Sequence, residues 1–286
     1  MDIMAPAKIN LYLGVFGKRR DGYHEIGTLF ERISVFDRIR LNIAEGPATI
    51  IVKGEYVPTG EDSLLEKTIT GFNLASGNRL DFNVELEKNI PVAAGMGGGS
   101  SDAAALLLGL NSITGNPLCE DKLEEIAGTL GADVPFFLKN ASFAFGTGRG
   151  DVIEKARTSL KLGHVIVNPP VKVGTKSVYD KISGFNLTMD GAWATMLALF
   201  LEKSDQASLL KYLRNDLQQI VLREFPILEE VISFLREAGA KCAMMTGSGP
   251  TVFGIFDMGR LEEAAKKTKE RFPKEEGWRV YDAVTV

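Results

Sequence analysis

The opening segment of the chain alternates between apolar and other side chains. One set of alternating positions is Ala5, Ala7, Ile9, Leu11 and Leu13, and the set between them includes Lys8, Asn10 and Tyr12. Successive side chains of a strand point to opposite faces, so this period of two predicts a strand with one polar face. Lys8 and Asn10 share that face and can point into one cleft. An exposed edge strand would explain the same alternation.

Similar patterns predict the other elements. Strands are expected at residues 38–43, 49–53, 80–86, 142–145, 164–168, 242–245, 251–256 and 279–284, and helices at 101–113, 121–130, 192–201, 207–213 and 227–238. Pro169 and Pro170 break the pattern after one strand, because proline cannot donate to a central ladder. We expect an N-terminal lobe over residues 1–155 and a C-terminal lobe over 156–286. Strands and helices mix in both halves without steady alternation, which favours two α+β lobes over one doubly wound sheet.

Composition narrows the class of protein. A chain of 286 residues with 45% hydrophobic content can bury the cores of two lobes. Its net charge of −4 provides no broad basic field, so nucleic acid is not an expected partner. Cys119 and Cys242 lie far apart, without further Cys or His at metal-ligand spacing, which indicates neither a disulfide framework nor a zinc site. The longest apolar run, residues 192–201, is too short to span a bilayer. We expect a cytoplasmic protein with no membrane and no obligate protein partner.

A glycine-rich segment precedes the helix expected at 101–113. Residues 95–99 contain four glycines. Glycines let backbone amides approach a ligand, and a helix N-terminus adds unpaired amides and partial positive charge, so the segment suits a polyphosphate. Ser100 or Ser101 could cap the helix or reach a phosphate or magnesium ion. A flexible turn before an ordinary capped helix fits the same composition.

Other phosphate-binding motifs are excluded. The chain has no GxxxxGK[ST] string, and the loop lacks the lysine of a P-loop. Gly95, Gly97 and Ser100 only approximate a dinucleotide fingerprint, which would be expected in a first strand-to-helix unit. Neither HRD nor DFG is present, so the chain is not a protein kinase.

Three ordered motifs carry a family resemblance. APAKIN at residues 5–10, the glycine-rich loop and TGSGP at 246–250 together resemble the GHMP small-molecule kinases. More narrowly, PAKINL at 6–11, DGYH at 21–24, GGGSSD at 97–102 and GADVPFF at 131–137 are similar to the 4-diphosphocytidyl-2-C-methyl-D-erythritol kinase family, essentially end to end. TGSGP alone could be a plain tight turn. Departures are small: Met96 stands where leucine is commoner, and Ala93 and Ala94 where several members carry glycine.

The resemblance implies an activity and a fold. Members phosphorylate the 2-hydroxyl of a cytidine-diphosphate-linked methylerythritol with ATP, in the non-mevalonate isoprenoid route. The fold is a two-lobed GHMP kinase, with an N-terminal lobe like domain 2 of ribosomal protein S5 and a ferredoxin-like C-terminal lobe. Magnesium would accompany ATP, with protein ligands that the sequence leaves unknown. The implied ATP-binding residues are Pro91, Val92, Ala93, Ala94, Gly95, Met96, Gly97, Gly98, Gly99, Ser100 and Ser101.

The resemblance also implies two catalytic residues. Asp133 falls on the family's catalytic aspartate, as the base or orienting group for the acceptor hydroxyl. Lys8 matches a lysine that stabilises the transferring phosphate and keeps the aspartate ionised. For Asp133 the alternative is a helix cap.

Five positions match substrate contacts of the family. Tyr23 and Tyr179 would stack on the cytosine, and His24 would hydrogen-bond to it. Asn10 and Thr175 match further contacts, the latter in a looser part of the alignment. A GHMP kinase for homoserine or mevalonate would not need the Tyr-His pair, and a non-catalytic nucleotide sensor would not need both Lys8 and Asp133.

Overall fold

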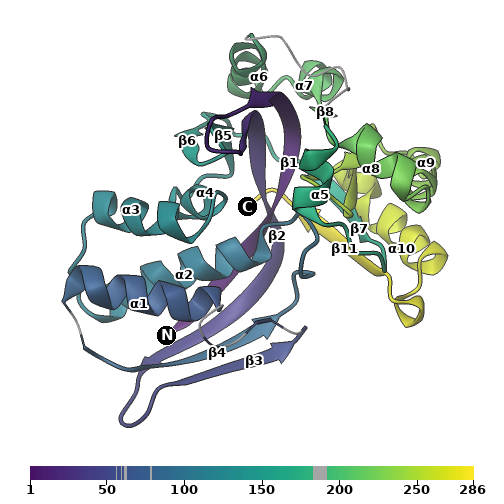
Figure 1. Cartoon of the computed structure of the whole chain (residues 1–286). Coiled ribbons are helices and arrows are strands. Elements are labelled where there is room, and N and C mark those ends of the chain that lie inside the picture. Colours follow the sequence, from purple (N-terminus) through teal and green to yellow (C-terminus); the bar gives the residue numbers. More distant parts are fainter. Residues whose placement is uncertain (56, 59, 61–62, 78, 183–191) are drawn as a thin grey trace. The chain divides into compact units, whose positions relative to one another are not determined.

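The computed structural model describes the chain apart from residues 56, 59, 61–62, 78 and 183–191 (Figure 1). The described residues form two compact units that interleave along the chain. Unit 1 comprises Met1–Ala7, Val35–Val92 and Gly97–Asn140, and unit 2 comprises Lys8–Ser34, Ala93–Met96 and Ala141–Val286. The long strands β1 (Asp2–Lys18) and β2 (His24–Ile43) contribute residues to both units. The lobe boundary at residues 155–156 stays a prediction.

Unit 1 packs helices against strands. β3 (Thr49–Gly54) runs parallel to β4 (Phe82–Lys88), and β4 pairs antiparallel with the second half of β2. The helices are α1 (Leu64–Ser76), α2 (Gly98–Ile113), α3 (Glu120–Leu130) and α4 (Val134–Leu138). Every second residue of β4 is buried, as the period of a strand requires. Its apolar residues Phe82, Val84 and Leu86 join Phe72 of α1 and Leu106 of α2 in one core.

Unit 2 contains strands in two sheets. β5 (Phe143–Thr147) pairs antiparallel with the first half of β2 and with β6 (Val152–Lys155), and β8 (Arg214–Asn215) pairs in parallel with β1. A separate antiparallel sheet has the order β11-β7-β10-β9. Its strands are β7 (Gly163–Asn168), β9 (Cys242–Met245), β10 (Val252–Phe256) and β11 (Arg279–Val284).

Helices of unit 2 build a second core on that sheet. They are α5 (Thr175–Asp180), α6 (Trp193–Glu202), α7 (Gln206–Tyr212), α8 (Gln218–Glu224), α9 (Ile227–Glu237) and α10 (Leu261–Arg271). In α9 the buried residues are Leu228, Val231, Ile232 and Leu235, the spacing of one helix face. They pack with apolar residues of β9 and β10.

The predicted elements are all present, with some shifted ends. β4 ends at Lys88 rather than residue 86, and α2 begins at Gly98 rather than residue 101. The first half of β2 was missed because it carries buried charge: Glu31 is fully buried and accepts hydrogen bonds from His164 and Thr285. Other missed elements are β6, β8, α1, α4, α5, α8 and α10. The buried face of α10 consists mostly of small residues, which give a weak apolar period.

Candidate functional site

The glycine-rich loop uses backbone conformations that side chains disfavour. Gly95 and Gly97 have φ angles of 76° and 69°, in the left-handed region. A Cβ atom on Gly95 would lie 2.7 Å from the carbonyl oxygen of Thr246, so the loop passes directly against the C-terminal glycine turn, residues 246–250. Ala93 also has a positive φ, of 55°, which costs alanine free energy that glycine would avoid. Packing and backbone conformation therefore require glycine at position 95.

The helix after the loop begins without a side-chain cap. Gly97 is the N-cap residue of α2, so of the two roles considered for Ser100 and Ser101 the structure excludes the helix cap. The left-handed conformation of Gly97 starts the helix early and places both serines inside its first turn. Ser101 is 1% exposed, and its Oγ has no hydrogen-bond partner among the described residues. Burying such a hydroxyl is costly, so a ligand oxygen at this helix start would satisfy it.

A buried ion cluster, which the sequence prediction missed, lies at the start of α2. Lys88 Nζ donates to Asp102 Oδ2 at 2.7 Å and also to Asp37 Oδ2. The other oxygen of Asp37 accepts the backbone N–H groups of Asn89 and Ile90 at 2.5 and 2.8 Å. Burial raises the pKa of Asp102 to about 7, against the attraction of Lys88 and with a further contribution from Asp37. The alternation of β4, which puts Lys88 on its buried face, was the available signal.

The polar face of β1 is buried in unit 2. Lys8 and Asn10 are 4% and 2% exposed, which excludes an exposed edge strand. Lys8 Nζ donates to Asn10 Oδ1 at 2.7 Å and lies 5.3 Å from the centroid of the Phe30 ring. The Asn10 amide donates to Thr28 Oγ1 at 2.7 Å, and its backbone N–H donates to Thr246 Oγ1 at 2.8 Å. Lys8 and Asn10 therefore meet, as the alternation predicts, while their roles stay predictions.

The C-terminal glycine turn packs against both β1 and the glycine-rich loop. A Cβ atom on Gly247, whose φ is 57°, would lie 3.3 Å from Asn10 Oδ1 and from the carbonyl oxygen of Gly95. The side-chain amide of Asn215 donates to the carbonyl oxygens of Met245 and Gly247, at 2.9 and 2.8 Å. The turn is thus held from two sides, which a plain connection between β9 and β10 would not need.

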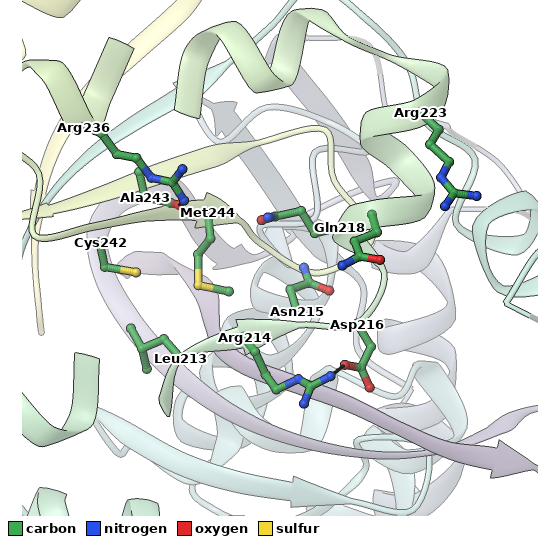
Figure 2. A pocket seen from close by; sticks show the side chains of 11 residues that line it. Leu213, Arg214, Asn215, Asp216, Gln218, Arg223, Arg236, Cys242, Ala243 and Met244 are labelled. Carbon is green, nitrogen blue, oxygen red and sulfur yellow. Dashed lines mark hydrogen bonds and ion pairs between the residues drawn. The ribbon is translucent and has the colours of Figure 1, made fainter. Parts of the chain in front are cut away.

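A pocket of about 620 Å³ adjoins the residues that hold this turn (Figure 2). Asn215 lines it together with Arg214, Arg223 and Arg236. Arg214 is paired with Asp216 at 2.5 Å. Figure 2 shows Arg223 and Arg236 on opposite sides of the pocket. The arginines do not converge on one point, so the pocket offers no focused anion site.

Two of the three rings predicted to hold the base lie against each other. The rings of His24 and Tyr179 are stacked, with centroids 5.2 Å apart and an interplanar angle of 29°. Tyr23 is 57% exposed, and the guanidinium carbon of Arg149 lies 5.1 Å from its ring centroid. The structure therefore brings His24 and Tyr179 together and leaves the Tyr23 ring accessible.

Thr175 and His24 have surroundings that suit polar recognition. Thr175 begins α5 and hydrogen-bonds through its hydroxyl to Ser248 of the C-terminal glycine turn at 2.8 Å. Burial lowers the pKa of His24, with nearby Lys18 acting in the same direction and Asp180 opposing both. The imidazole is therefore mainly neutral near pH 7 and offers one donor and one acceptor nitrogen.

Asp133 is the residue directly before α4, in unit 1. It stands at the N-cap position, but its side chain makes no capping hydrogen bond. The alternative role, a helix cap, is therefore contradicted. Its catalytic role and its pairing with Lys8, a residue of unit 2, stay predictions.

The described residues show neither a metal-binding cluster nor a membrane-spanning helix. They contain no group of three or more His, Cys, Asp or Glu side chains that could hold a metal ion. Cys119 and Cys242 are free thiols. Among the helices that the structure describes, none has the length and apolar character needed to cross a membrane.

Sequence comparisons point to one family. The GHMP kinases N terminal domain matches residues 63–140, and the GHMP kinases C terminal domain matches residues 183–274. A 4-diphosphocytidyl-2-C-methyl-D-erythritol kinase of Syntrophotalea carbinolica is 38% identical over 280 residues, which cover 97% of this chain and 96% of the relative. The protein of the same name in Pelotomaculum thermopropionicum is 40% identical over 254 residues, 88% of each chain.

Solved structures agree with the sequence matches. A crystal structure of 4-(cytidine 5'-diphospho)-2C-methyl-D-erythritol kinase matches with a TM-score of 0.83 and 30% identity, over 99% of this chain and 98% of that one. Homoserine kinase from Cytophaga hutchinsonii matches with a TM-score of 0.73 and 17% identity, over 100% and 94% of the two chains. The second likeness shows the shared α+β fold alone.

Proposed function

The chain belongs to the GHMP kinases and, within them, to the 4-diphosphocytidyl-2-C-methyl-D-erythritol kinases, and we propose that it catalyses that family's reaction. ATP transfers its γ-phosphoryl group to the 2-hydroxyl of 4-diphosphocytidyl-2-C-methyl-D-erythritol, giving the 2-phosphate and ADP. The product continues along the non-mevalonate route to isoprenoid precursors. We place this reaction in the cytoplasm, where the free thiols Cys119 and Cys242 would stay reduced.

The stacked pair of His24 and Tyr179, taken with the exposed ring of Tyr23, is the observation that favours a cytidine-bearing acceptor. Stacking on an aromatic side chain contributes roughly 1 to 3 kcal/mol per base. The neutral imidazole of His24 adds a donor and an acceptor for the polar edge of cytosine. Homoserine and mevalonate carry no aromatic base, so these side chains would give them no binding energy.

The glycine-rich loop and the first turn of α2 are the proposed phosphate site. The N-terminal amides of α2 have no side-chain cap, and the buried Ser101 hydroxyl lacks a partner among the described residues. Both features suit phosphate oxygens. Mg²⁺ supplies charge neutralisation on the phosphates when bound. Since the described residues offer no carboxylate cage, the phosphates and water would provide most of its ligands.

Asp133 and Lys8 are the proposed catalytic pair. Phosphoryl transfer needs positioned reactants and compensation of charge on the moving group. The Asp133 carboxylate, which caps no helix, would accept or orient the proton of the acceptor hydroxyl. The Lys8 ammonium, oriented by Asn10 and the Phe30 ring, would stabilise the transferring phosphoryl group.

An acceptor comparison tests the proposed function. ADP release would be measured with ATP and, in separate reactions, the cytidine-diphosphate compound, homoserine or mevalonate. We expect turnover with the cytidine-diphosphate compound alone, and a phosphate ester at its 2-position by phosphorus NMR. Turnover of another alcohol without turnover of that compound would refute the assignment.

The Asp133→Asn variant tests the proposed base. Removing the carboxylate while keeping its shape should lower kcat about 100-fold or more, because general acid–base catalysis contributes on that scale. Asp121→Asn is a matched control, since Asp121 also lies at a helix start, in the first turn of α3. It should keep wild-type kcat. An Asp133→Asn enzyme as fast as wild type would remove Asp133 from the mechanism.

A further inference from the structure

The first turn of α2 is held by a side-chain contact to strand β4 rather than by an N-cap side chain. Gly97 supplies no side chain, and neither serine of the turn takes over its role. The contact is made by Asp102, which lies one turn into the helix. Asp102 accepts a hydrogen bond from Lys88 at 2.7 Å. Since both side chains are at most 3% exposed, water does not compete for this contact.

Lys88 connects this turn to the strands of unit 1. It is the last residue of β4, and its ammonium also contacts Asp37 of β2. Asp37 in turn binds the backbone of Asn89 and Ile90, just before the glycine-rich loop. The entry to the loop and the helix that follows it are therefore fixed to the same ammonium group.

The Lys88 ammonium also lies against the helix backbone itself. A Cβ atom on Gly98 would stand 2.8 Å from Lys88 Nζ and 2.9 Å from Ile90 Cγ2. Only glycine lets the backbone come this close. The position of Lys88 thus sets how deeply the start of α2 sits on β4. Ser101, the residue before Asp102, keeps its unpartnered hydroxyl in that turn.

We propose that Lys88 is a positioning residue for ATP, which acts through Asp102 and Gly98 to hold residues 97–101 in the geometry that receives the phosphates. The inference rests on the proposed phosphate site of the preceding section. Lys88 does not touch the nucleotide phosphates: its side chain is 2% exposed and engaged by two carboxylates. It acts by fixing where the backbone amides of residues 97–101 and the Ser101 hydroxyl lie. Phosphate binding depends on this placement because hydrogen-bond donors must be preorganised.

Two substitutions at Asp102 test this role while Lys88 keeps its other partner, Asp37. Asp102→Ala removes the tie to α2 and leaves Lys88 with Asp37 as its partner. Asp102→Asn keeps an oxygen that can accept the Lys88 hydrogen bond. The matched control is Glu85→Ala, on the same strand, which breaks ion pairs to Lys53 and Arg40 at the surface. Calorimetric titration would give the dissociation constants of ATP, ADP and adenosine for each protein.

A positioning role predicts a loss that depends on the phosphates. Asp102→Ala should weaken ATP binding about tenfold and leave adenosine within about twofold, because a misplaced turn affects only the groups it contacts. Asp102→Asn should restore most of the ATP affinity, and Glu85→Ala should match wild type. The ratio of ATP to adenosine affinity is insensitive to any unfolded fraction, because that fraction lowers both equally.

Several results would overturn the inference. These are an Asp102→Ala protein with unchanged ATP affinity, an equal loss for ATP and adenosine, and an Asp102→Asn protein as weak as Asp102→Ala. The proposed function fails differently. A wild-type protein that binds ATP but does not phosphorylate the cytidine-bearing acceptor refutes that function and leaves the role of Lys88 standing.

Discussion

Lys8 of unit 2 and Lys88 of unit 1 are both buried, at 4% and 6% exposure, yet they have partners of different kinds. Lys88 contacts two carboxylates, which compensate its charge. The contacts of Lys8 within unit 2 include the amide oxygen of Asn10 and the face of the Phe30 ring, which orient the ammonium. Burial alone thus does not decide what a lysine does, and the roles proposed for Lys8 in catalysis and for Lys88 in positioning have to be tested separately.

Lys8→Met should give the largest effect and act on rate. Methionine keeps the length of the side chain but removes the charge proposed to stabilise the transferring phosphoryl group. We expect kcat to fall about 100- to 1,000-fold, the scale of losing one electrostatic contact to a transition state. The melting temperature, measured on the same sample, should stay near wild type. A variant with near-normal kcat would show that Lys8 does not stabilise the transferring group, and the proposed contrast with Lys88 would fail.

Lys88→Met should act mainly on stability, besides the loss of ATP affinity that its positioning role predicts. It leaves Asp37 and Asp102 buried without their counter-ion, which costs about 3 to 5 kcal/mol of unfolding free energy. Urea unfolding followed by circular dichroism measures the loss. A Lys88→Met protein as stable as wild type would mean that the two carboxylates find other compensation, and the contrast with Lys8 would disappear.

The sequence could reveal one of these lysines but not the other. Lys8 belongs to a motif, and its place between apolar residues already put it beside Asn10. Lys88 was overlooked because the predicted strand stopped at residue 86, where the apolar alternation ends, whereas β4 continues to Lys88 on the same buried face. A charged residue at a buried position of a strand can be recognised as such only when its buried counter-ion is known. For Lys88 that counter-ion is Asp37, which lies on another strand, β2.

Other features depended on contacts between distant residues. Asn10 and Thr246 are hydrogen-bonded across 236 positions, and no local pattern could place them together. The start of α2 was predicted at residue 101, where the glycine-rich segment ends. The left-handed Gly97 starts the helix earlier, and the cluster around Lys88 does the work of a cap. The alternating strand β4 and the amphipathic α9 were predictable because one regular apolar face decides each of them.

The ion cluster should also make stability depend on pH in an unusual direction. The pKa of Asp102 is raised from 3.8 to about 7. The folded chain therefore holds a proton that the unfolded chain releases. The resulting stability is complete below pH 3.8 and lost as pH rises through about 7.

Comparison with Asp102→Asn isolates this effect. Between pH 5 and pH 8, wild type should lose unfolding free energy relative to the variant, by up to about 4 kcal/mol over the whole shift. Urea unfolding of both proteins at several pH values measures the difference. Parallel pH profiles of the two proteins, or a relative gain by wild type, would contradict a raised pKa at Asp102.

The smallest effect is expected at the exposed face of β4. Glu85 pairs with Lys53 and Arg40 at 2.6 and 2.8 Å, close to the 2.7 Å between Lys88 and Asp102, but its partners are largely exposed. Water and salt screen such pairs, so Glu85→Gln should shift the melting temperature by no more than about 2 °C. The shift should vanish at high salt, whereas the loss in Lys88→Met should persist there. If Glu85→Gln were as damaging as Lys88→Met, the ion pairs themselves would decide stability along this strand, and burial would not explain why Lys88 matters.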